Sequence, residues 1–116
     1  MENTIFAKLA AKELIIGDGA FGTMLQAAGL PAGIMPEAWN LDKPDAVRAV
    51  HALYVEAGAD YVTTNSFGAN APRLEDGGLG GRVAELNRLA VTLAKEAVAG
   101  RAWVAGSVGP TGQLME

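Results

Sequence analysis

Apolar and polar positions follow two different rhythms along this chain, and these predict strands and helices in turn. Short runs rich in apolar and β-branched residues, at 14–17, 61–65 and 102–108, are typical of strands. The longer segments 44–57 and 81–99 repeat apolar residues every three or four positions, as amphipathic helices do. The pattern therefore predicts a strand, helix, strand, helix, strand order.

The sequence also contains start and stop signals for these helices. Asp42 is a candidate N-cap of the first, and Pro44 fits the first turn, where a missing N–H has no consequence. A glycine follows each long helix and predicts its end. A short helix is also expected over residues 3–12, capped by Asn3 or Thr4. The expected apolar faces are Ile5, Phe6 and Leu9; Ala46, Val47, Val50, Leu53, Tyr54 and Ala57; and Val83, Leu86, Leu89, Ala90, Leu93 and Ala97.

Consecutive strands joined by helices run parallel, so the chain is expected to be of the α/β class. Each predicted strand is followed by glycine or small polar residues, which would gather at the carboxyl ends of the strands. Ligands bind at that edge both in (β/α)8 barrels and in open doubly wound sheets. Residues 29–36 and 68–80 are rich in glycine and proline, and we expect loops there.

The first strand opens into the loop Gly17-Asp18-Gly19-Ala20-Phe21-Gly22, which allows three interpretations. It satisfies G-x-G-x-x-G, but residues 23–28 leave little room for the helix that a dinucleotide fingerprint needs. Alternatively, the glycines form a tight turn in which Asp18 bonds its own backbone. In a third interpretation, Asp18 holds the ammonium of an amino acid and nearby backbone amides hold its carboxylate.

Other candidate residues have simpler interpretations. Thr63-Thr64-Asn65-Ser66 ends the second strand, and alternation allows only Thr64 with Ser66, or Thr63 with Asn65, to face one cavity. His51 lies on the first long helix without an evident catalytic partner, so we expect a surface or packing role. Trp39 is expected to anchor its loop rather than to bind a ligand.

Composition narrows the classes of function further. The chain has 116 residues, of which 50% are hydrophobic and 19% charged, as in a globular domain. Its net charge of −4 argues against a nucleic-acid partner. The start does not resemble a signal peptide, and the sequence contains no long apolar window of membrane-spanning length, so we expect no membrane association and a cytoplasmic location. It contains no cysteine, which excludes thiolate metal ligands within this chain.

Taken together in order, several segments resemble the homocysteine S-methyltransferase family, over about residues 13–115. The resemblance is greatest to the homocysteine-binding domain of cobalamin-dependent methionine synthase, and betaine–homocysteine methyltransferase is more distant. The matching segments are Asp18-Gly19-Ala20-Phe21-Gly22-Thr23-Met24, Glu37-Ala38-Trp39-Asn40-Leu41, Pro44-Asp45-Ala46-Val47 with His51, Glu56-Ala57-Gly58-Ala59-Asp60, Thr63-Thr64-Asn65-Ser66-Phe67-Gly68-Ala69 and Gly106-Ser107-Val108-Gly109-Pro110-Thr111-Gly112.

The resemblance implies a (β/α)8 TIM barrel in which a homocysteine thiol, bound to a cysteine-ligated zinc ion, accepts a methyl group and gives methionine. It implies substrate binding by Asp18, Gly19, Ala20 and Thr64. Residues 1–116 would be the N-terminal portion of that domain, about three β/α units, truncated after the third strand. Zinc ligands, and any cobalamin or folate donor, would then belong to other parts of the protein. No catalytic or metal-binding residue is assigned within this chain, and the methyl donor is undetermined.

A truncated barrel leaves apolar strand edges open, so we expect either a complementing C-terminal fragment or self-association. Two other functional classes remain open from the sequence. One is a non-catalytic α/β module that pairs with a partner chain, and the other is a nucleotide-binding βαβ unit.

Overall fold

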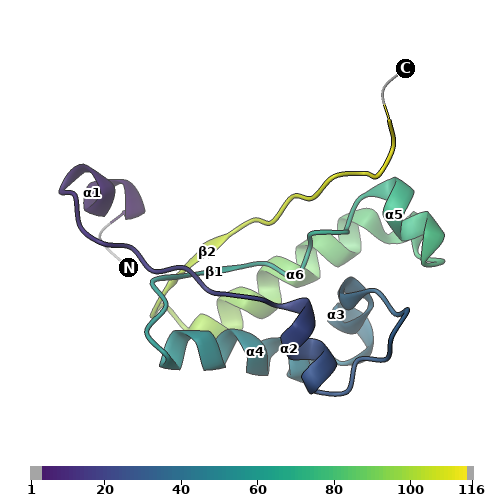
Figure 1. Cartoon of the computed structure of the whole chain (residues 1–116), viewed down its shortest axis with the longest axis horizontal. Helices are drawn as coiled ribbons and strands as arrows, with labels where there is room; N and C mark the ends of the chain where they lie inside the picture. The colour runs from purple at the N-terminus through teal and green to yellow at the C-terminus, as the bar shows by residue number, and fades with distance from the viewer. Residues whose placement is uncertain (1–3, 115–116) are drawn as a thin grey trace.

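The computed structural model describes residues 4–114 and shows a small α/β arrangement (Figure 1). Two three-residue strands, β1 (Tyr61–Thr63) and β2 (Trp103–Ala105), pair in parallel, with Tyr61 opposite Trp103 and Thr63 opposite Ala105. The longest helices, α4 (Pro44–Glu56) and α6 (Val83–Val98), lie along one side of these strands. The α/β class and the parallel pairing are therefore confirmed.

The prediction of a first strand over residues 14–17 is wrong, because no regular strand forms there. Only Gly17 forms a parallel bridge, to Tyr61, although Ile16 also accepts hydrogen bonds through its carbonyl from the N–H of Asp60 (2.6 Å) and of Tyr61 (3.4 Å). The Ile16 N–H donates to the Asp60 carboxylate at 2.9 Å instead of to a backbone carbonyl. The regular ladder of backbone hydrogen bonds therefore does not extend further along this segment. The segment is also not buried as expected, since Leu14 is 82% exposed.

Helix α4 begins at Pro44 as predicted, but its N-cap is Lys43 and no side chain caps it. Asp42 cannot be the cap, because it is the last residue of a separate short helix, α3 (Trp39–Asp42). Helix α6 ends at Val98 through a left-handed Ala99, one residue before the predicted stop. The buried face of α6 differs from the predicted one. It includes Ala94 and Val98, which were not predicted, while Leu89 and Ala97, which were, are only half-buried.

The glycine-rich and proline-rich segments contain short helices that the sequence pattern did not predict. Helix α5 (Ala71–Asp76) lies in the expected loop 68–80, where the Asn70 side chain accepts a hydrogen bond from the Arg73 N–H and caps the first turn. The short turns of 3-10 helix, η1 (Pro36–Ala38) and η2 (Gly80–Arg82), precede α3 and α6. Helix α2 (Gly22–Ala27) follows the first glycine loop.

The N-terminal helix, α1 (Ile5–Ala10), has the predicted Thr4 cap, whose hydroxyl accepts from the Ala7 N–H. Asn3, the alternative cap, lies outside the described residues. The expected apolar face of α1 is not buried, because Phe6 is 76% exposed. Helix α1 lies at the end of the strands opposite to α3 and α5 (Figure 1). No helix among residues 4–114 is long and apolar enough to cross a membrane.

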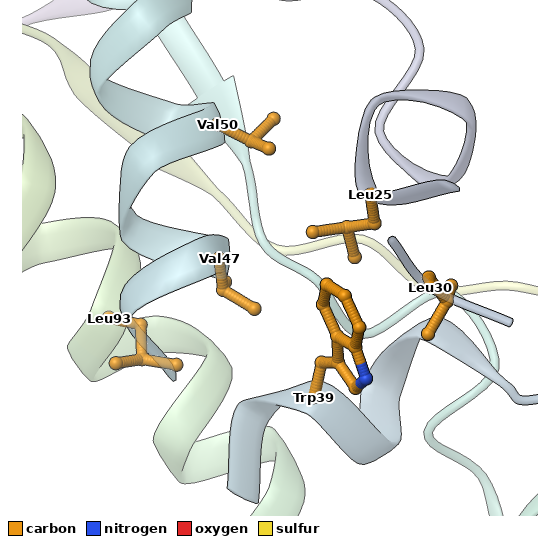
Figure 2. Close-up of a cluster of buried hydrophobic side chains, with 6 residues drawn as sticks. All are labelled: Leu25, Leu30, Trp39, Val47, Val50 and Leu93. Atoms are coloured by element: carbon orange, nitrogen blue, oxygen red, sulfur yellow. The ribbon is translucent and has the colours of Figure 1, made fainter. Parts of the chain in front are cut away.

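The main core joins α4 to the segments that precede it. Figure 2 shows Val47 and Val50 of α4 directed toward Leu25, Leu30 and Trp39, with Leu93 of α6 at the side. Burial of Trp39 in this cluster confirms its predicted anchoring role. A second cluster packs Val62 of β1 against α6 and the end of α4, and a third joins α5 to α6. These contacts fix the loops at the carboxyl ends of the strands.

Candidate functional site

A cavity of about 440 Å³ lies where the carboxyl ends of the strands were expected to gather polar residues. Its walls come from the first glycine loop, from η1 and from the segment that follows β1. The lining residues are Gly19, Phe21, Gly22, Met35, Pro36, Glu37, Thr63, Thr64, Asn65, Ser66, Phe67, Gly68, Arg73 and Ser107. Small hydrogen-bonding groups and two aromatic rings thus share one hollow.

The Asp18 carboxylate is held by the end of β1. Its Oδ2 accepts the Thr63 N–H at 2.9 Å, and the Thr63 hydroxyl lies 3.2 Å from both carboxylate oxygens. The Asp18 N–H donates in turn to the Tyr61 carbonyl at 3.1 Å. Asp18 therefore joins the first glycine loop to β1 rather than bonding its own turn, and it is not among the residues that line the cavity.

Gly19 and Ala20 follow Asp18 in the loop beside the cavity. Gly19 lines it, whereas Ala20 does not, and the Ala20 carbonyl accepts a hydrogen bond from the Tyr54 hydroxyl. Within residues 4–114, no acceptor is assigned to the N–H of Gly19 or of Ala20. Such free backbone donors are what an anionic group requires.

Residues 63–66 all line the cavity, so the expectation that only one alternate pair could face it is wrong. Strand β1 ends at Thr63, and the Ser66 N–H turns back to the Thr64 carbonyl at 2.8 Å, so strand alternation does not apply to this segment. The Thr64 and Ser66 hydroxyls are 2.6 Å apart. Thr64 Oγ1 accepts the Ser107 N–H at 3.0 Å, and the Ser66 hydroxyl donates to the Ser107 carbonyl at 2.8 Å. These bonds join the loop after β1 to the loop after β2. Thr64 thus lines the cavity with a hydroxyl that already has protein partners.

The sequence pattern did not single out Glu37, which is only 4% exposed and lines the cavity. Its Oε1 accepts the Gly68 N–H at 2.6 Å, and among the described residues Oε2 has no hydrogen-bond partner. Glu37 belongs to one of the segments that carry the resemblance, but its neighbours give no periodic signal that its carboxylate is buried. Its role follows only from the tertiary structure.

Asn40 and Asn65 form a buried amide pair beside Glu37. The Asn65 side-chain amide donates to Asn40 Oδ1 and to the Pro36 carbonyl, both at 2.9 Å. Asn40 Nδ2 donates to the backbone carbonyl of Asn65 at 2.9 Å. The segment around η1 is thereby joined firmly to the loop after β1.

His51 is fully buried, and its ring centroid lies 4.7 Å from that of Phe21. Neither ring nitrogen has a hydrogen-bond partner within the described part of the chain. Burial lowers the pKa of His51 from 6.5 to about 4, because the charged imidazolium would lose its hydration. The packing role expected for His51 is thus confirmed, and it is neutral at physiological pH.

Residues 4–114 offer no set of side chains that could hold a metal ion. The whole sequence contains no cysteine, and the described residues contain no group of three or more His, Cys, Asp or Glu side chains placed to hold a metal ion. A cysteine-ligated zinc ion therefore does not fit the residues present here.

Comparison with known proteins identifies the family. The family model "Homocysteine S-methyltransferase" matches residues 15–116. Methionine synthase of Mycobacterium tuberculosis is 32% identical over 124 aligned residues, which cover 97% of this chain and 10% of that protein. Betaine–homocysteine S-methyltransferase 1 of Xenopus laevis is 36% identical over 115 residues, covering 92% of this chain and 28% of that protein.

Solved structures give the same result. The metallated form of the homocysteine methyltransferase MmuM from Escherichia coli matches with a TM-score of 0.75 and 32% identity, over 88% of this chain and 40% of that one. The oxidized form matches with a TM-score of 0.79 and 30% identity, over 95% and 42%. The chain thus spans less than half of these structures and less than a third of the two curated relatives above. With a match over most of its own length, it belongs to the homocysteine S-methyltransferase family.

Proposed function

We propose that this chain is the N-terminal portion of a homocysteine-binding (β/α)8 barrel and forms part of the substrate pocket of a homocysteine S-methyltransferase. In the proposed reaction the homocysteine sulfur forms a bond to the methyl carbon, the bond from that carbon to the donor breaks, and the thiol proton is released. The products are methionine and the demethylated donor. The observation that carries the proposal is the cavity at the carboxyl ends of the strands, inside the segment that matches the family.

The cavity suits the amino-acid end of homocysteine. Asp18 is proposed to bind the ammonium, since a carboxylate has about four lone-pair positions and Thr63 supplies only two donors. The unbonded N–H groups of Gly19 and Ala20 are proposed to bind the carboxylate. Thr64, which lines the cavity, is proposed to contribute its hydroxyl. The ammonium and the carboxylate of the ligand would then both be bound by the first glycine loop, next to the segment that follows β1.

The arrangement of the sheet supports the barrel. Helices α4 and α6 cover the face of the sheet that carries Val62, whereas Tyr61 and Trp103 border an open apolar hollow of about 590 Å³. Parallel sheets are normally covered on both faces, and in a barrel the inner face is covered by the remaining strands. We propose that this hollow faces the barrel interior.

Zinc and the methyl donor lie outside what this chain can hold. If zinc takes part, its ligands belong to another part of the protein, and the same applies to a cobalamin or folate donor. A cytoplasmic location is part of the proposal and can be tested by cell fractionation. The two alternative functions, a non-catalytic pairing module and a nucleotide-binding unit, are less favoured because the family match covers the cavity.

The proposal can be tested by joining residues 1–116 to the part of E. coli MmuM that follows its matched segment. We expect the joined protein to form methionine from homocysteine with a methyl donor that intact MmuM accepts, and intact MmuM is the positive control. A joined protein that folds, binds metal as MmuM does and forms no methionine would contradict the proposal.

A further inference from the structure

Phe67 is a large apolar residue that is well exposed although the rest of segment 64–69 is buried. Phe67 is 57% exposed, while residues 64–66 and 68–69 are buried. The ring also lines the candidate cavity. We propose that Phe67 is a ligand-contacting residue that packs against the aliphatic part of the bound amino acid, and that Glu37 is its positioning residue. This inference rests on the proposed function and adds a specificity-determining contact to it.

The backbone of Phe67 is fixed from both sides. At one end, Asn65 bonds to Asn40 and to the Pro36 carbonyl. At the other, the Gly68 N–H donates to Glu37 Oε1 at 2.6 Å. A Cβ atom at position 68 would lie only 2.9 Å from that oxygen, so a side chain there would displace the Glu37 carboxylate. A short charge-assisted bond of this kind holds a loop more firmly than a neutral one.

The Phe67 ring is supported from below by Gly109, which follows β2. A Cβ at position 109 would lie 2.9 Å from two carbon atoms of the ring and would collide with the Phe67 carbonyl. The ring therefore lies directly on the Gly109 backbone. An exposed aromatic ring that rests on backbone, in a segment fixed on both sides, can contact a ligand with little loss of side-chain freedom.

The chemistry of the cavity indicates what the ring contacts. The cavity wall combines polar groups, among them the hydroxyls of Thr64 and Ser66 and the carboxylate of Glu37, with apolar surface to which Phe67 contributes. Ligand sites combine such fixed polar groups with apolar surface that covers the carbon skeleton. Homocysteine has two methylene groups between its charged end and its sulfur. These groups need an apolar contact, and Phe67 provides one at the cavity wall.

The test is equilibrium dialysis of L-homocysteine against the full chain, kept reduced, which is straightforward because the chain has no cysteine to exchange. Phe67→Ala is expected to weaken binding about tenfold, as truncation of an aromatic anchor does. Glu37→Ala should weaken it by a similar factor, and Glu37→Gln should stay near the parent value because its amide oxygen can still accept the Gly68 N–H. Leu53→Ala is the matched control, since Leu53 is 53% exposed on α4 and does not line the cavity.

Parent-like binding by Phe67→Ala, with the parent binding homocysteine, would overturn this inference and leave the proposed function intact. The same holds if Glu37→Gln loses as much binding as Glu37→Ala, which would show that charge rather than position matters. Failure of the folded parent to bind homocysteine would overturn this inference, whereas the proposed function is decided separately by methionine formation in the protein joined to MmuM. Melting curves of every variant show whether a loss of binding reflects unfolding.

Discussion

The buried histidine offers a quantitative test of the packing around the candidate site. His51 is fully buried against Phe21, and its pKa is lowered from 6.5 to about 4 by burial alone. Above pH 6.5 the ring is neutral in both the folded and the unfolded chain, so it adds no pH dependence. Between pH 6.5 and 4 the unfolded chain binds a proton that the folded chain excludes, and stability falls as the pH falls.

The size of the effect follows from the shift in pKa. At about 1.4 kcal/mol per pKa unit, the full loss below pH 4 is about 3 kcal/mol. Most of it, about 2 kcal/mol, occurs between pH 7.5 and pH 5, before the carboxylates with ordinary pKa values take up protons. His51→Leu has a side chain of similar size without ring nitrogens, and is expected to lose this dependence.

The assay is urea unfolding followed by circular dichroism, at one protein concentration, for the parent and for His51→Leu. We expect the parent to lose about 2 kcal/mol more than the variant between pH 7.5 and pH 5. Equal losses in the two proteins would refute the reasoning, since they would show that His51 is protonated as readily in the folded chain as in the unfolded one.

Further predictions concern the substrate, the metal and association. In the protein joined to MmuM, Asp18→Ala should raise KM for homocysteine with metal content unchanged, because a charge-assisted hydrogen bond of about 1.5–3 kcal/mol is lost. Asp18→Asn can still accept a hydrogen bond from Thr63, so it separates the effect of the charge from that of the contact with β1. An unchanged KM in both variants would exclude substrate binding by Asp18. The chain alone should not bind zinc tightly at one ion per chain, and stoichiometric binding in dialysis against zinc would contradict the absence of ligands. Because the face around Tyr61 and Trp103 is open, sedimentation should show oligomers, whereas a monomer with a cooperative melt would exclude that expectation.

The helices were the most predictable part of the fold. The bounds of α4 and α6 followed from apolar periodicity and from the glycines that end them, to within a few residues. Helix α5 was missed because Pro72 and the following glycines indicated a loop, whereas Asn70 and Pro72 in fact start a short helix. The first strand was predicted from its apolar letters alone, which cannot show that the Asp60 side chain replaces a backbone partner.

The candidate site was predictable in place but not in detail. The glycine loop and the polar run after β1 do come together at one cavity, as parallel strands require. Two hydrogen bonds of the site join residues more than 40 positions apart, which the sequence pattern cannot show. They are the bond from the Thr63 N–H to Asp18 and the bond from the Ser107 N–H to the Thr64 hydroxyl. Glu37 was missed for the same reason, since only the folded chain brings it to the Gly68 N–H.

The central claim is that the cavity at the carboxyl ends of the strands binds homocysteine. Hydrogen–deuterium exchange of the full chain, with and without saturating L-homocysteine, tests it most directly, because exchange locates the bound ligand on the sequence. We predict slower exchange at residues 17–22 and 63–68 and no change in α1. Unchanged exchange in both segments, or protection confined to the open face lined by Tyr61 and Trp103, would contradict the claim.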